Sequence, residues 1–125
     1  MTGVVGIGVD VTEVSRIAAA IEKRPRFVER IYTSAEAEYC RRMRTPWRRF
    51  ATRFAGKEAV MKSLGMGARG VTWTDIEILG RGKPEVHLSG KVAERAERLG
   101  VRRVEISLTH GEDMAIAVAV AVAVS

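Results

Sequence analysis

Apolar and polar positions follow two different repeats along the chain. An apolar run, VVGIGVDV, comes first, and apolar residues then recur every three or four positions, as on one face of a helix, up to about residue 64. In WTDIEIL and EVHLS, after residue 72, they alternate with polar residues, which is typical of half-buried strands. The pattern predicts a strand, three helices, two strands, a fourth helix and two final strands.

Helix start and stop signals set the boundaries of the first three helices, expected over about 13–23, 33–43 and 46–64. Thr12 is expected to cap the first helix. The capping-box sequence TSAE opens the second, and a Thr-Pro pair opens the third. The glycine-rich sequence GMGARG then ends the third helix.

The second half of the chain is expected to be mostly strand. WTDIEIL and EVHLS, joined by the turn GRGKP, form a predicted hairpin, and an amphipathic helix over 90–100 follows. Strands are expected over 101–110 and over the apolar run that begins at Met114. Alanine and valine alternate in that run, so both of its faces should be covered, in a central strand or in a subunit interface. Hairpin pairing predicts an α+β fold, an antiparallel sheet packed with a long helix.

Composition narrows the class of protein. With 125 residues, 46% hydrophobic and 29% charged, the chain is expected to form one domain, residues 1–125, with a core of its own. The single cysteine, Cys40, allows no internal disulfide and is expected to pack as a small apolar residue. No signal peptide is recognised and the last apolar run is too short for a membrane helix, so we expect a cytoplasmic protein.

The net charge of +6 favours anionic partners. Nucleic acid, a phosphorylated cofactor and an acidic protein would each satisfy it. Only 6% of residues are aromatic and no nucleic-acid recognition motif is present, which argues against nucleic acid.

Two carboxylates occupy apolar surroundings in the pattern. Asp10 lies near the end of the first strand, and Glu58 lies on the apolar side of the third helix. Carboxylates placed in this way suit Mg²⁺, which takes one or two protein carboxylates together with waters and phosphate oxygens. The alternative is a local ion pair, such as Glu58 with Lys62 one turn later.

Basic residues on the same helix suggest phosphate binding. Arg53, Lys57 and Lys62 precede the glycine-rich loop, whose backbone amides could approach phosphates. Lys57 shares a side of the helix with phenylalanines, so that side is expected to border a pocket or a subunit boundary. His110, at a strand end, could accept a proton or could be structural.

Taken together, these segments resemble the holo-acyl-carrier-protein synthases, the short phosphopantetheinyl transferases. GIGVDVTEVSRI, RFAGKEAVMKSLG, DIEI, GKPEVHLSG and SLTHGEDMAIAVAV stand in the order and spacing of that family. The likeness covers nearly the whole chain and is weakest over residues 25–50. It implies a Mg²⁺-dependent transfer of 4′-phosphopantetheine from coenzyme A to a serine of apo-acyl carrier protein, leaving 3′,5′-ADP, in fatty acid biosynthesis.

The resemblance also implies roles for individual residues. The implied metal ligands are Asp10 and Glu58; the implied catalytic residues are Glu58, Lys62 and His110. The implied contacts to coenzyme A are Arg53, Lys62, Gly65, Lys83, Pro84 and His110. The choice of general base among Lys62, His110, Glu58 and a metal-bound water stays open.

Arg16, and less strongly Arg24, correspond to the family's basic contacts to the acidic carrier protein. The resemblance further implies a homotrimer with a site at each subunit boundary. Two departures from the family pattern are Gly56, where alanine is usual, and Gly111, where some relatives carry an acidic residue. The alternative function is that of a non-enzymatic nucleic-acid-binding or coenzyme-A-binding protein.

Overall fold

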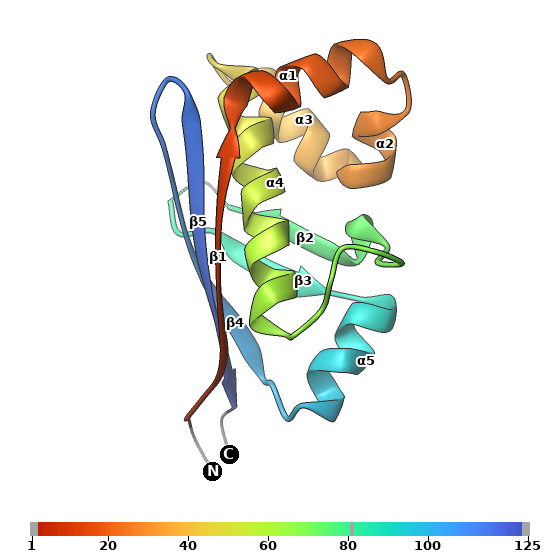
Figure 1. The fold of residues 1–125 in the computed structure, drawn as a ribbon, viewed down its shortest axis with the longest axis vertical. Helices are drawn as coiled ribbons and strands as arrows, with labels where there is room; N and C mark the ends of the chain where they lie inside the picture. The colour runs from red at the N-terminus through yellow and green to blue at the C-terminus, as the bar shows by residue number, and fades with distance from the viewer. Residues whose placement is uncertain (1–2, 81, 124–125) are drawn as a thin grey trace.

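The computed structural model describes residues 3–80 and 82–123, which form two antiparallel sheets and five α-helices (Figure 1). In chain order the elements are β1 (Gly3–Glu13), α1 (Val14–Lys23), α2 (Phe27–Ile31), α3 (Ser34–Arg42), α4 (Pro46–Ser63), the 3₁₀ turn η1 (Trp73–Asp75), β2 (Ile76–Leu79), β3 (Glu85–Leu88), α5 (Gly90–Arg98), β4 (Arg103–His110) and β5 (Met114–Ala123). The predicted α+β class is confirmed. Within the described ranges, no helix is long and apolar enough to cross a membrane.

The larger sheet has the strand order β1-β5-β4, and α4 covers one of its faces (Figure 1). β5 is therefore the central strand, which confirms one of the two positions expected for the last apolar run. Its inward alanines (Ala115, Ala117, Ala119 and Ala121) are fully buried. Ile116 and Val118, on the opposite face of β5, are each 38% exposed. Within a single chain only one face of β5 is therefore covered, and not both as expected.

β1 and α4 approach each other so closely that only glycine fits between them. A Cβ added to Gly8 would lie 1.9 Å from the carbonyl oxygen of Ala59, and one added to Gly6 would lie 2.0 Å from that of Ser63. The GIGVD sequence thus brings the β1 backbone against the helix. This contact brings Asp10, two residues after Gly8, to the same seam between strand and helix.

Two local expectations at the start of the chain are wrong. The N-cap position of α1 is Glu13, whose side chain makes no capping hydrogen bond, and the hydroxyl of Thr12 donates instead to Asp10 Oδ2 at 2.6 Å. A short helix, α2, lies between the first two predicted helices. The capping box of α3 is present as expected: Thr33 Oγ1 accepts from the Glu36 amide, and the Glu36 carboxylate accepts from the Thr33 amide.

The predicted hairpin forms from β2 and β3, although residues 73–75 are a 3₁₀ turn rather than strand. Arg81, in the expected turn, lies outside the described residues. Cys40 is fully buried, and burial raises the pKa of its thiol to about 12, which confirms the expected packing role.

The expectation for Lys57 is also wrong. Lys57 and Glu36 are both fully buried and form an ion pair with Nζ 2.7 Å from Oε1. The ammonium also donates to the carbonyl oxygens of Ile76 (2.5 Å) and Trp73 (3.2 Å). Lys57 therefore contacts neither a pocket nor a phosphate, since a buried cation needs close partners and has all of them inside the protein.

Candidate active site

Three of the predicted site residues meet at the seam between β1 and α4. Lys62 Nζ donates to the carbonyl oxygen of Val9 at 2.9 Å and lies 3.5 Å from Asp10 Oδ1. The Asp10 side chain is only 15% exposed and is held on its other oxygen by Thr12. Glu58 lies one turn before Lys62 on the same side of α4. Lys62 thus pairs with Asp10, across the seam.

Asp10 lies within electrostatic reach of Glu58 across the seam. Burial raises the pKa of Glu58, and the negative charge of Asp10 raises it further, while Lys62 and Arg16 oppose the shift. Two carboxylates held near each other in a half-buried setting favour a bound cation or proton. In the part of the chain that the structure describes, no three His, Cys, Asp or Glu side chains form a metal cluster. A metal here would rely on two carboxylates and on ligands from outside the chain.

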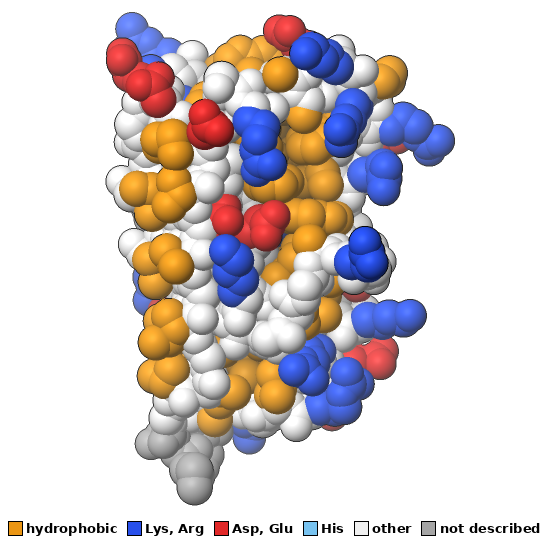
Figure 2. Space-filling model, viewed as in Figure 1, with side chains coloured by type: hydrophobic (Ala, Val, Ile, Leu, Met, Phe, Trp, Pro, Cys, Tyr) orange, Lys and Arg blue, Asp and Glu red, His pale blue; other side chains and the backbone are white. Residues whose placement is uncertain are grey.

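The surface view shows the same arrangement. A small acidic patch lies near the middle of the face in Figure 2, over the region where Figure 1 places β1 and α4, with basic side chains above and below it. Hydrophobic side chains form a column along the left side of this view, beside the sheet.

A groove adjoins the carboxylates at α1. Arg16 lies within electrostatic reach of Glu58, and its guanidinium carbon is 5.4 Å from the centre of the Phe54 ring. The groove measures about 460 Å³; its lining includes Arg16 and Lys23 on α1, Arg24 directly after that helix, and the apolar residues Phe27, Ile31, Phe54 and Trp73. The two arginines predicted to contact a partner protein therefore line one groove, which has an apolar floor and a basic rim.

The other predicted cofactor contacts lie across α4. Arg53 is 4% exposed, stacks over the Tyr39 ring at 4.7 Å and donates to the carbonyl oxygen of Gly80 at 3.3 Å. Lys83 lies 3.2 Å from Glu105 on β4, next to Pro84. His110 ends β4, which is separated from β1 by β5. These residues do not join Asp10 and Glu58 within one chain.

Gly65 lies beyond the end of α4 with a φ of +68°, a conformation that favours glycine. Arg95 of α5 covers this end of the helix, where its Nε donates to the carbonyl oxygen of Leu64 at 3.0 Å. The loop at Gly65 therefore begins about one turn after Lys62, and its cationic neighbour is Arg95 of the same chain.

Sequence reasoning missed several residues of the site. Thr12 was interpreted as a helix cap, although its spacing of two from Asp10 on one strand places both side chains on one face. The stacked pair Phe54 and Trp73, with ring centres 5.0 Å apart, was not recognised as a groove floor.

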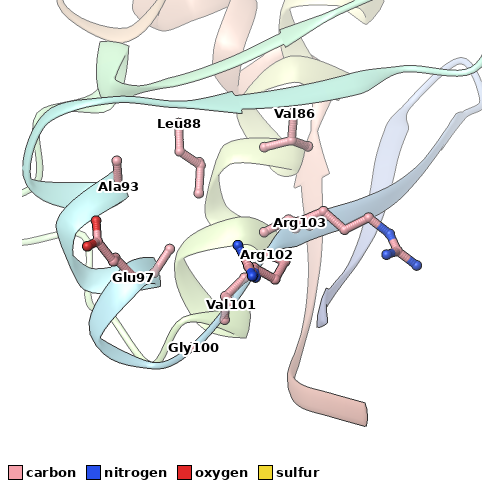
Figure 3. A pocket seen from close by; sticks show the side chains of 10 residues that line it. Val86, Leu88, Ala93, Glu97, Gly100, Val101, Arg102 and Arg103 are labelled. Atoms are coloured by element: carbon pink, nitrogen blue, oxygen red, sulfur yellow. The ribbon is translucent and has the colours of Figure 1, made fainter. Parts of the chain in front are cut away.

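A separate pocket of about 610 Å³ lies between β3, α5 and the start of β4 (Figure 3). Val86 and Leu88 point from β3 toward Val101, and the guanidinium of Arg103 points away from the hollow. None of the predicted site residues lines it.

Comparison with known proteins gives matches over nearly the whole chain. The sequence model of the "4'-phosphopantetheinyl transferase superfamily" matches residues 6–119. The holo-[acyl-carrier-protein] synthase of Caldanaerobacter subterraneus is 46% identical over 118 residues, which cover 93% of each chain. The crystal structure of a holo-ACP synthase from Plasmodium yoelii superposes with a TM-score of 0.87 at 28% identity over 100% of this chain and 99% of that one.

A further structure, the holo-(acyl-carrier-protein) synthase of Bacillus anthracis in complex with CoA (3′,5′-ADP), gives a TM-score of 0.78 at 30% identity over 97% of this chain and 98% of that one. The fold is thus that of a phosphopantetheinyl transferase. The chain belongs to the 4′-phosphopantetheinyl transferase superfamily, among the holo-[acyl-carrier-protein] synthases, and the resemblance inferred from the sequence is confirmed.

Proposed function

We propose that this chain transfers the 4′-phosphopantetheine group of coenzyme A to a serine of an apo-acyl carrier protein, with Mg²⁺ held by Asp10 and Glu58. Family membership supports the reaction, and the meeting of Asp10, Glu58 and Lys62 at the β1–α4 seam is the observation that carries the site. The products are the holo-carrier and 3′,5′-ADP.

The two carboxylates suit Mg²⁺. Asp10 raises the pKa of Glu58, so a divalent cation between them would relieve a repulsion that Lys62 and Arg16 relieve only in part. Mg²⁺ commonly takes one or two carboxylates and completes its shell with waters and phosphate oxygens. A pair of carboxylates beside a phosphorylated substrate is therefore a sufficient donor set.

In the transfer, the serine oxygen forms a bond to the phosphorus that carries the pantetheine, and the bond from that phosphorus to the oxygen of 3′,5′-ADP breaks. Bound Mg²⁺ would neutralise charge on the diphosphate. Lys62, whose side chain is 52% exposed, can place its ammonium against the departing phosphate. Glu58, Lys62 and His110 are the side chains available to take the serine proton.

We assign Arg53, Gly65, Lys83, Pro84 and His110 to coenzyme A, in a site shared between two copies of the chain. Arg53 and His110 lie across α4 from the carboxylates, which favours contributions from different copies. The exposed apolar side chains on the outer face of the large sheet (Ile7, Val9, Val11, Ile116 and Val118) support a homotrimer that buries them.

The groove beside α1 suits an acidic carrier protein. Its basic rim, with Arg16 and Arg24, would attract acidic side chains, and its aromatic floor would receive an apolar one. Arg16 also lies near Glu58, so a partner docked there would have its serine close to the carboxylates. We infer that the physiological substrate is a carrier protein of fatty acid synthesis, and that the reaction takes place in the cytoplasm.

The test is transfer to a purified apo-acyl carrier protein, followed by intact mass spectrometry. With coenzyme A and Mg²⁺ the carrier should gain one phosphopantetheine, and EDTA should abolish the gain. Asp10→Ala and Glu58→Ala should each lower the rate at least about a hundredfold while the protein stays folded, because each removes a metal ligand. Normal turnover in either variant would contradict the metal assignment.

A further inference from the structure

The fully buried ammonium of Lys57 holds the 3₁₀ turn η1, which follows the glycine-rich loop. Its Nζ donates to the carbonyl oxygen of Trp73, the first residue of the turn, at 3.2 Å, and to that of Ile76, directly after the turn, at 2.5 Å. The Trp73 carbonyl also accepts from the Ile76 amide, which closes the turn. Lys57 therefore fixes the backbone of this turn at both of its ends.

The ring of Trp73 is held by the same helix. Phe54 lies three residues before Lys57 and therefore on the same side of α4. The Trp73 and Phe54 rings stack with their centres 5.0 Å apart and their planes at 19°. The Arg16 guanidinium lies 5.4 Å from the centre of the Phe54 ring. A continuous series of contacts thus leads from the buried ammonium to Arg16, at the rim of the groove beside α1.

The chain before the turn gives Trp73 little support from neighbouring elements. Among the described residues, no atom lies within 4 Å of a Cβ added at Gly70, three residues before the turn. At the end of the turn, the Asp75 carbonyl accepts from the Ser89 amide at 2.9 Å. Lys57 is the side chain that donates to the beginning of the turn, at Trp73.

Glu36 keeps Lys57 in the form that donates. Burial lowers the pKa of Lys57, whereas the charge and the hydrogen bond of Glu36 oppose that shift. Glu36 Oε2 also accepts from the Ile78 amide at 2.8 Å, two residues beyond Ile76. The ion pair therefore holds both the turn and the strand that follows it.

We propose that Lys57 is a positioning residue for the carrier protein. Its ammonium fixes the backbone of Trp73, and the Trp73–Phe54 stack in turn fixes the groove floor against which Arg16 lies. The inference rests on the proposed docking of the carrier in the groove beside α1. Lys57 is fully buried and makes no contact with a docked partner, so it acts through Trp73. A preordered surface binds more tightly, because less conformational freedom is lost on binding.

The experiment measures steady-state transfer from coenzyme A to a purified apo-acyl carrier protein by the double variant Glu36→Gln/Lys57→Met. This variant removes the ammonium without leaving a carboxylate buried and unpaired. The KM for the carrier should rise about fivefold or more, because Trp73 must then be ordered during docking. The kcat and the KM for coenzyme A should stay within about twofold of the wild-type values, because the groups assigned to coenzyme A are unchanged.

Val101→Ala is the control for lost stability. Val101 is a buried core residue that lines the separate pocket of Figure 3 and does not line the groove beside α1. The KM of this variant for the carrier should stay within about twofold of the wild-type value. A rise equal to that of the double variant would overturn the proposal, because lost stability alone would then explain both.

Trp73→Ala tests whether Lys57 acts through Trp73. Alone, it should raise the KM for the carrier at least as much as the double variant does, and the combined changes should raise it no further. Effects that multiply would overturn the proposal, and so would an unchanged KM in Trp73→Ala. The second of these results is decisive even if the double variant does not fold, because Trp73 is only partly buried and its truncation leaves the Glu36–Lys57 pair in place.

A second readout follows Trp73 without turnover. In a Trp47→Phe background Trp73 is the sole tryptophan of the chain, and time-resolved fluorescence anisotropy measures the local motion of its ring. The double variant should show a larger amplitude of fast motion than the wild-type pair, and Val101→Ala should not. Equal amplitudes with and without the Glu36–Lys57 pair would overturn the proposal.

The wild-type protein and Arg16→Gln, in the same transfer assay, separate this inference from the proposed function. An inactive wild-type protein would refute the proposed function. An unchanged carrier KM in Arg16→Gln would refute docking in the groove, and with it this inference. A raised carrier KM in Arg16→Gln together with a normal one in the double variant would refute only the positioning role of Lys57.

Discussion

At the scale of single residues, the packing around Gly56 explains why a glycine stands inside the long helix. It lies on the side of α4 that faces β2 and β4. A Cβ there would lie 2.6 Å from Ile78 Cδ1 and 3.2 Å from the terminal methyls of Ile106 and Leu108. The large aliphatic side chains of this chain occupy the space that a methyl group on the helix would need.

We therefore expect Gly56→Ala to be destabilising. The gain in helix propensity is about 1 kcal/mol, and overpacking costs about 1–3 kcal/mol, so the free energy of unfolding should fall by about 1 kcal/mol. In an Ile78→Val background, which removes Cδ1, the same change should be neutral or stabilising. Urea denaturation of the four proteins in this cycle measures the coupling; strictly additive effects would contradict the packing explanation.

Asp10 and Glu58 could be singled out from the sequence because they break the apolar pattern. Asp10 follows an apolar strand and Glu58 lies among phenylalanines, and each placement is costly without a partner. The hydrogen bond from Thr12 to Asp10 was hidden, because the same residue is also a good helix cap. Lys57 and Glu58 looked alike in sequence, yet one is buried in an ion pair and the other borders the site; only their tertiary neighbours separate them.

At the scale of elements, the Glu36–Lys57 pair joins three segments that are far apart in the chain. Glu36 completes the capping box of α3, its Oε2 accepts from the Ile78 amide of β2 at 2.8 Å, and it pairs with Lys57 of α4. Burial lowers the pKa of Lys57, and the charge and hydrogen bond of Glu36 oppose that shift. Glu36 therefore favours the charged form of Lys57 against the effect of burial.

Removing one partner should be far worse than removing both. Lys57→Met leaves the Glu36 carboxylate buried and unpaired, so the free energy of unfolding should fall by about 3–5 kcal/mol. Adding Glu36→Gln keeps the acceptor for the Ile78 amide and removes the charge, so the double variant should recover at least half of the loss. Chemical denaturation provides the measurement, and a double variant less stable than Lys57→Met would show that the charges themselves are not responsible.

Most elements followed from local signals, and the exceptions have physical causes. The capping box fixed the start of α3, alternation identified β4, and the valine-rich apolar run identified β5. α2 spans only five residues, too short for a helical repeat to be visible, and it depends on Phe27 and Ile31 packing against their neighbours. The 3₁₀ turn before β2 carries the same alternation as a strand, so periodicity alone could not separate them.

At the scale of the whole molecule, the long helix divides the predicted site into two halves. The carboxylate half lies at β1, and the cationic half lies at β4 and the β2–β3 hairpin. Adjacent strands are about 4.8 Å apart, and β5 lies between β1 and β4, so roughly 10 Å of sheet and the helix itself separate the halves. Sequence order gives no warning of this separation, because Arg53 and Glu58 are close neighbours along the chain.

A site shared between copies makes a specific prediction about mixed assemblies. Glu58→Ala damages the carboxylate half, and His110→Ala damages the cationic half. If each site takes one half from each of two neighbouring chains, co-refolding equal amounts of the two inactive variants should restore activity. In randomly mixed closed rings, about a quarter of the boundaries would pair an intact carboxylate half with an intact cationic half.

The mixture should therefore recover about a quarter of wild-type activity, in the transfer assay at equal total chain concentration. Each variant refolded alone is the negative control. A double variant that carries both changes in one chain, refolded with the wild-type protein, corrects for the dilution of intact chains. Light scattering on the mixture confirms that the variants share assemblies. Recovery would require that the halves come from different chains, because neither variant has both. Mixed trimers without recovery would mean that one chain completes its own site, and the composite arrangement would be wrong.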